Sequence, residues 1–100
     1  MAPVPAKLVT IIAVFDAREQ ILQKLRGLGI RGFSIGHLEG HGTHGTQRSG
    51  LVENDNYSFL IVTTEEKAAT LLAWFEKDVM PIAPGIAYSS DVNAVLPGGA

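Results

Sequence analysis

The sequence contains no cysteine, and it has few charged side chains. Without thiols, a disulfide framework, a thiol nucleophile and a zinc–thiolate site are excluded. The 8 basic and 10 acidic residues give a formal net charge of -2, which provides no basic surface for nucleic acid or for an anionic membrane. No apolar run approaches the ~20 residues that a membrane-spanning helix needs. We therefore expect neither nucleic-acid binding nor direct membrane insertion.

Hydrophobic residues make up 46% of the 100 positions. This content predicts a single compact domain over residues 1–100. The first residues, Met1 to Ala6, lack the charged and apolar regions of a secretory signal. We expect a cytoplasmic protein.

Four segments have the composition of β-strands: Lys7 to Phe15, Gly32 to Glu39, Tyr57 to Thr63, and Gly85 to Leu96. The first and third are apolar on both faces, so both of their faces should be buried.

A first helix is predicted after Asp16, which can cap it together with Glu19 at the reciprocal position of a capping box. Gly29 is a natural C-terminal stop. The inner stripe of this helix consists of Ala17, Ile21, Leu25 and Leu28.

A second helix is predicted after Thr63, which fits a capping box with Glu66. Pro81 and Pro84 should end it. Its apolar residues at helical spacing are Ala68, Leu71, Leu72, Phe75 and Val79.

The resulting order is strand, helix, strand, strand, helix, strand. It predicts an α+β, ferredoxin-like βαββαβ fold, with a four-stranded antiparallel sheet and two helices on one face. Two helices cannot cover the other face, where aliphatic side chains would remain wet at a cost of ~1.5–3 kcal/mol each. We therefore expect the uncovered faces to pack together in a homo-oligomer.

The segment from Gly40 to Gly50 contains four glycines, one arginine and no aliphatic side chain, so it cannot be core. Its N–H groups can close around an anion while Arg48 neutralises the charge. This pattern favours a loop that becomes ordered on a phosphate-bearing ligand. A flexible hairpin connection without a ligand is the alternative.

Several short segments agree with one known pattern: Lys7-Leu8-Val9, Gly32-Phe33-Ser34-Ile35, Glu39-Gly40-His41-Gly42, Arg48-Ser49-Gly50 and Pro84-Gly85-Ile86-Ala87-Tyr88. With them the chain resembles the PII-like signalling superfamily. It looks closest to the short-loop branch that includes the bicarbonate-transporter-associated and carboxysome-associated proteins.

The resemblance implies a homotrimer whose sheets line the centre and whose clefts bind an adenine nucleotide, with bicarbonate as a further signal for some members. Gly40 to Gly50 would correspond to the T-loop, and Gly85-Ile86 to the second nucleotide-binding loop. Pro84-Gly85-Ile86 lacks the lysine, and the loop lacks the tyrosine, that nitrogen-regulatory PII proteins use. ADP or AMP is therefore expected rather than a triphosphate, and uridylylation is not expected.

Arg48 can grip phosphate or bicarbonate with its planar fork. The glycines allow close backbone approach to the anion, and the hydroxyl groups of the loop can donate to phosphate or ribose. The predicted nucleotide- or anion-binding residues are Gly40, His41, Gly42, Thr43, Gly45, Thr46, Arg48, Ser49, Gly50, Gly85 and Ile86.

His37, His41 and His44 suggest an alternative, a CutA-like trimeric protein that binds a divalent metal. Because two of these histidines lie in the glycine-rich segment, ordering a metal site would be costly, and we expect no metal site. The Ser, His and acidic residues do not form a recognisable nucleophile elbow. We therefore expect that the protein has no catalytic residue, needs no cofactor and is not an enzyme. The expected function is signalling in inorganic carbon metabolism, through an unidentified transporter or carbon-fixation component.

Overall fold

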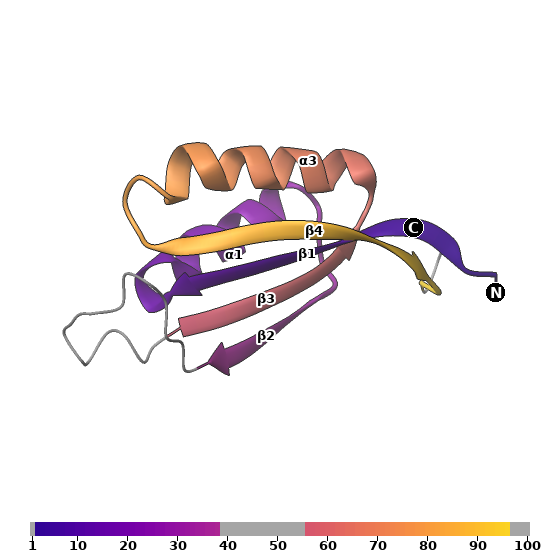
Figure 1. The fold of residues 1–100 in the computed structure, drawn as a ribbon, viewed down its shortest axis with the longest axis horizontal. Coiled ribbons are helices and arrows are strands. Elements are labelled where there is room, and N and C mark those ends of the chain that lie inside the picture. Colours follow the sequence, from indigo (N-terminus) through magenta and orange to yellow (C-terminus); the bar gives the residue numbers. More distant parts are fainter. Residues whose placement is uncertain (1, 39–55, 97–100) are drawn as a thin grey trace.

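The computed structural model describes residues 2–38 and 56–96. The chain folds in the predicted order of strands and helices (Figure 1). The strands pair antiparallel in the order β2-β3-β1-β4, which confirms the predicted α+β ferredoxin-like fold. The strands are β1 (Val4–Val14), β2 (Phe33–Leu38), β3 (Asn56–Thr63) and β4 (Gly85–Ala94), and the helices are α1 (Arg18–Gly27) and α3 (Glu65–Trp74).

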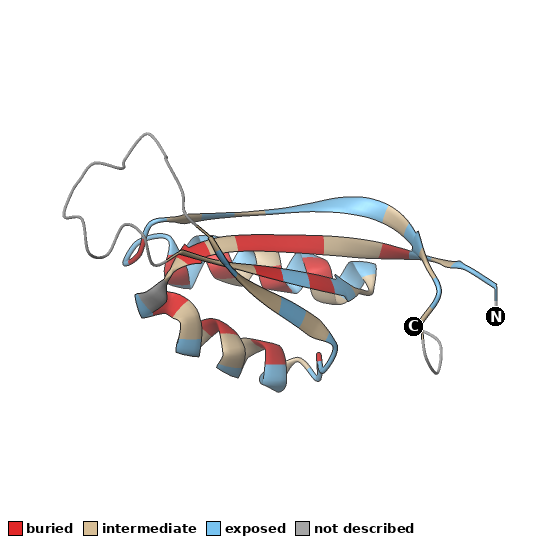
Figure 2. Cartoon of the chain, turned by 90° about the horizontal axis from the view of Figure 1, so that it is seen from below, coloured by how far each residue is buried: buried red, intermediate tan, exposed pale blue. Residues whose placement is uncertain are grey.

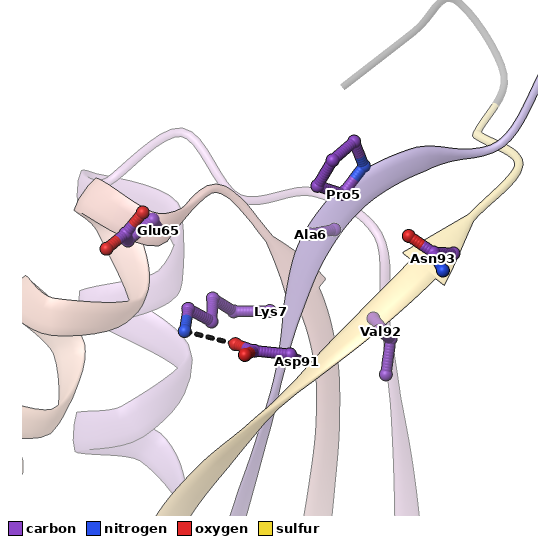
Figure 3. A pocket seen from close by; sticks show the side chains of 7 residues that line it. All are labelled: Pro5, Ala6, Lys7, Glu65, Asp91, Val92 and Asn93. Carbon is purple, nitrogen blue, oxygen red and sulfur yellow. Dashed lines mark hydrogen bonds and ion pairs between the residues drawn. The ribbon is translucent and has the colours of Figure 1, made fainter.

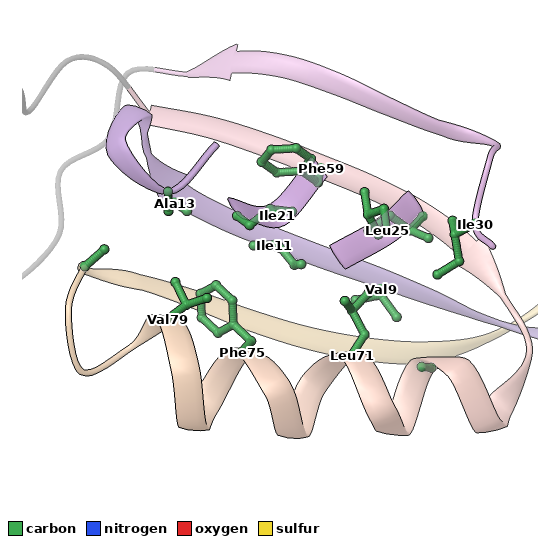
Figure 4. Close-up of a cluster of buried hydrophobic side chains, with 14 residues drawn as sticks. Val9, Ile11, Ala13, Ile21, Leu25, Ile30, Phe59, Leu71, Phe75 and Val79 are labelled. Carbon is green, nitrogen blue, oxygen red and sulfur yellow. The ribbon is translucent and has the colours of Figure 1, made fainter. Parts of the chain in front are cut away.

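The core lies between one face of the sheet and both helices (Figure 4). Alternation along β1 places Val9, Ile11 and Ala13 on this face, and all three are buried. Phe59 and Ile61 of β3 lie beside them. Figure 2 shows the buried residues gathered on β1 and on one side of each helix. Most helical residues predicted from spacing are buried in this core: Ala17, Ile21 and Leu25 from the first helical segment, and Ala68, Leu71, Phe75 and Val79 from the second. The predicted Leu28 and Leu72 are only partly buried and pack against its edge.

The opposite face of the sheet carries exposed apolar side chains from two strands. Leu60 and Tyr88 flank Thr10, and they are 46% and 49% exposed. Val62 of β3 and Ile86 of β4 are also exposed, so the apolar surface extends along the sheet. We call these residues, with Leu8 and Ile12 between them on β1, the open sheet face.

The start of α1 differs from the prediction. Phe15–Ala17 forms a 3-10 turn, η1, and the helix is capped at Ala17 without a side-chain hydrogen bond. Asp16 is therefore not the cap. The end was predicted correctly, because Gly29 has a φ of 75°. The Gly29 N–H donates to Arg26 O and the Ile30 N–H to Leu25 O, a pairing that closes the helix with a left-handed residue.

The second helix begins one residue later than predicted. Thr64 is its N-cap, and its Oγ1 accepts from the Lys67 N–H at 3.2 Å. The Thr63 capping box is therefore wrong, since Thr63 is still the last residue of β3. The helix continues past Trp74 as a π-helical turn, η2 (Phe75–Val79), up to the predicted end.

Strand lengths also differ from the predictions. β1 begins at Val4 rather than Lys7, because Val4 to Ala6 pair with β4, and it stops before Phe15. β4 ends at Ala94 rather than Leu96. β2 spans Phe33–Leu38, within the predicted segment.

Candidate functional site

Most of the predicted binding residues, Gly40 to Gly50, lie outside the described residues, as do His41 and His44. Gly85 and Ile86 are described. The segment 39–55 leaves from the end of β2 and returns at the start of β3, and β4 also starts at this end of the sheet (Figure 1). The described residues that flank this segment, Leu38 of β2 and Asn56 of β3, therefore lie at the same end of the sheet as the two predicted residues of β4.

The strand register defines one transverse row of residues at this end. Ala13 of β1 pairs with Gly85 of β4 and with Tyr57 of β3, and Tyr57 pairs with His37 of β2. We call these four residues the end row. Adjacent strands lie about 4.8 Å apart, so Gly85 lies about 10 Å from Tyr57 across the sheet.

Gly85 is a glycine because there is no room for a side chain. A Cβ there would lie 2.7 Å from the Ile12 carbonyl oxygen and 3.1 Å from the Phe75 ring. Packing alone thus accounts for this residue, whatever else its backbone binds. The side chain of Ile86 belongs to the open sheet face and is 52% exposed.

The Tyr57 ring contacts the side chains of Arg18 and His37. The Arg18 guanidinium carbon lies 5.5 Å from the ring centroid, within cation–π range. The His37 ring meets the Tyr57 ring edge-on, with centroids 5.2 Å apart. Arg18 was not among the predicted residues. One feature of the sequence could have drawn attention to Arg18: it is a basic residue at the start of a predicted helix, where the helix dipole favours acidic residues.

A groove of about 520 Å³ lies at the opposite end of the sheet (Figure 3). Lys7 and Asp91, which face each other across β1 and β4, form an ion pair in it. The hydrogen bond that Lys7 donates to Asp91 is the largest cause that raises the pKa of Lys7, and the nearby charges of Asp91 and Glu65 raise it further. The groove thus contains an ammonium group that is paired with the Asp91 carboxylate and lies near the charge of Glu65.

The described residues include no group of three His, Cys, Asp or Glu side chains that could hold a metal ion. The alternative hypothesis of a metal site with His37, His41 and His44 stays untested, because His41 and His44 lie outside this part of the chain. None of the helices in the described ranges is long and apolar enough to cross a membrane.

The model of the nitrogen regulatory protein P-II family matches residues 6–96. No curated protein matches the chain. Among solved structures, it is similar to one described as a PII-like signalling protein from Thermus thermophilus. The identity is 32% and the TM-score 0.79, over 95% of this chain and 94% of that one.

The chain is also similar to CPII from Thiomonas intermedia. The CPII structure bound to ADP and bicarbonate is 25% identical, with a TM-score of 0.77 over 92% of this chain and 90% of that one. A second CPII structure, bound to ADP, AMP and acetate, is also 25% identical, with a TM-score of 0.76 over 99% and 97% of the two chains.

Proposed function

Because the chain belongs to the nitrogen regulatory protein P-II family, we propose that it is a homotrimeric PII-like signalling protein that binds ADP or AMP between its subunits. The observation that carries the proposal is the similarity, over nine-tenths of both chains, to CPII bound to ADP and bicarbonate. The sequence supports the proposal further with Arg48, which belongs to a glycine-rich segment. This segment connects β2 and β3, close in the chain to His37 and Tyr57 of the end row.

The nucleotide occupies the end of the sheet at which residues 39–55 begin and end. Arg48 binds its phosphate bidentately, and backbone N–H groups of Gly40, Gly42 and Gly45 close around the same anion. Thr43, Thr46 and Ser49 donate to phosphate or ribose, and bicarbonate is a second anion for the same guanidinium. His41, Gly50, Gly85 and Ile86 complete the proposed site.

The homotrimer is supported by the open sheet face. Leu60, Val62, Ile86 and Tyr88 lie on this one face and are at least one-third exposed in the single chain. Burial of a large apolar side chain contributes about 1.5–3 kcal/mol. Association through this face removes the apolar surface from water and creates clefts between neighbouring copies.

Ligand binding selects an ordered form of the segment Gly40 to Gly50, and a partner protein recognises that form. The partner is a transporter or a carbon-fixation component. The protein acts as a cytoplasmic sensor of nucleotide and inorganic carbon, and it catalyses no reaction.

Calorimetry with ADP, AMP and bicarbonate, singly and in pairs, tests this function. We expect ADP or AMP to bind, and Arg48→Ala to weaken binding at least ten-fold because a charge-assisted contact to phosphate is lost. Arg31→Ala is the matched control, since Arg31 is an exposed arginine between α1 and β2. If the wild-type protein binds no adenine nucleotide, the proposed function is wrong.

A further inference from the structure

Thr10 is the only polar residue that is buried in the described ranges. It lies in the middle of β1 and is 7% exposed. Its neighbours in the strand, Val9 and Ile11, face the helices, so the Thr10 side chain lies on the other side of the sheet, among the residues of the open sheet face. Its hydroxyl group makes no hydrogen bond with any residue in 2–38 or 56–96. A buried hydroxyl without a partner is costly, so we expect a partner from outside the chain.

The two residues beside Thr10 cover its hydroxyl group but do not bond to it. β1 lies between β3 and β4 (Figure 1), and Thr10 is paired with Leu60 of the one and Tyr88 of the other. Side chains of a strand stand roughly perpendicular to the sheet, so the Tyr88 ring carries its own hydroxyl past Thr10 and toward the solvent. A partner for Thr10 must therefore reach down between two longer side chains.

The side of the sheet on which Thr10 lies carries no Asp, Glu, Lys or Arg in the described strands. A charged ligand or peptide would find no opposite charge there, whereas a second copy of the same surface brings no charge to be buried. The register places these other polar residues on this side: Ser34, Asn56, Ser58, Tyr88 and Ser90. Of these, only Tyr88 has a side chain long enough to reach between the tips of the residues that flank Thr10.

We propose that Tyr88 of one copy donates a hydrogen bond from its hydroxyl group to the Thr10 Oγ1 of a neighbouring copy. This inference rests on the proposed homotrimer and names a polar contact within its interface. The contact joins β4 of one copy to β1 of the next, so it connects two different patches of the surface. Such heterologous contacts close into rings, and a trimer has three equivalent pairs. Each pair supplies the partner that the Thr10 hydroxyl lacks in the single chain.

A double-mutant cycle on the dissociation of the trimer, measured by sedimentation equilibrium, tests the contact. Tyr88→Phe and Thr10→Val each remove one hydroxyl group and nearly keep the shape of the side chain. We expect Tyr88→Phe to raise the dissociation constant about a hundred-fold, because three hydrogen bonds worth about five-fold each are lost. Adding Thr10→Val to Tyr88→Phe should then change little, because the bond is already absent.

Ser90→Ala is the matched control. It removes a hydroxyl group from the same side of β4, but the serine is too short to reach Thr10. The dissociation constant of this variant should stay within about ten-fold of the wild type, as for an ordinary surface change in three copies.

Chemical denaturation of each variant separates association from folding. If Tyr88→Phe does not fold, a comparison of Thr10→Ser, which keeps a hydroxyl group, with Thr10→Val tests the same bond. Additive losses in the cycle, or a loss in Tyr88→Phe no greater than in Ser90→Ala, would overturn the contact while the homotrimer stands. A wild-type protein that sediments as a monomer would instead remove the homotrimer, and with it the proposed function.

Discussion

The carbonyl oxygen of Ile12 lies 2.7 Å from the position that a Cβ atom on Gly85 would occupy. Real Cβ atoms essentially never come so close to another heavy atom, and the oxygen belongs to the backbone of β1, the most buried strand. The start of β4 is thus packed directly on the strand beside it. The structure gives this glycine a steric reason that holds with or without a ligand.

Gly85→Ala should therefore destabilise the protein. Overpacking of this kind costs about 1–3 kcal/mol, because β1 or the Phe75 ring must move. Chemical denaturation measures the change in the free energy of unfolding. Gly32→Ala is the control, since its Cβ would meet no atom within 4 Å, and it should change stability by less than about 0.5 kcal/mol. Equal stability of the two variants would contradict the steric argument.

Thr64→Ala should destabilise α3, because the Thr64 Oγ1 accepts the Lys67 N–H at the helix N-terminus. Loss of a hydroxyl cap typically costs about 1 kcal/mol. Thr63→Ala, at the last position of β3, is the control and tests the rival capping box directly. The structure would be wrong at this point if thermal denaturation showed Thr63→Ala as the more harmful of the two.

The positions of the two helices and the buried side of each element could be predicted from the sequence, because apolar spacing reports which face needs burial. Helix starts were less predictable. Thr63 and Thr64 both have a hydroxyl group that can cap α3. Which of them is the N-cap depends on the backbone position at which β3 ends and the helix begins. Asp16 failed as a cap because a 3-10 turn separates it from α1.

The candidate site was predictable only in part. Gly85 was selected as a residue that allows close approach, but the group that approaches it within the chain is the β1 backbone. The contact of Arg18 with Tyr57 joins a helix to a strand 39 positions away in the sequence. Such a contact follows from strand register and helix placement, which a one-dimensional pattern does not contain.

The ion pair of Lys7 and Asp91 predicts a pH dependence at the alkaline end. The folded-state pKa of Lys7 is raised above 10.5, first by the Asp91 hydrogen bond. The stabilisation from this pair is therefore fully present below the unfolded pKa, and it is lost as the pH rises through the folded pKa.

Asp91→Asn should lower the pKa of Lys7 and remove this alkaline dependence, whereas Glu65→Gln, which acts only through its more distant charge, should lower it less. NMR titration of the lysine Cε signals measures the change. A larger effect of Glu65→Gln than of Asp91→Asn would contradict the order of causes.

Leu60→Lys should convert the proposed trimer into monomers. Leu60 lies in the middle of the open sheet face, where it pairs with Thr10 and Ser34. In a trimer built on this face, each copy would bury an ammonium group without a partner carboxylate, and the cost exceeds the apolar gain of ~1.5–3 kcal/mol from the original leucine. Light scattering should give three times the chain mass of 10.7 kDa for the wild type and the single mass for the variant.

Met80→Lys is the matched control for this experiment. Met80 is 50% exposed, close to the 46% of Leu60, but it follows η2 rather than lying on the sheet. The same change of charge should therefore leave the oligomer intact. A wild-type protein that runs as a monomer would remove the role of the open sheet face, and with it a nucleotide site between copies. Dissociation by both variants would assign the effect to general charge repulsion instead of this surface.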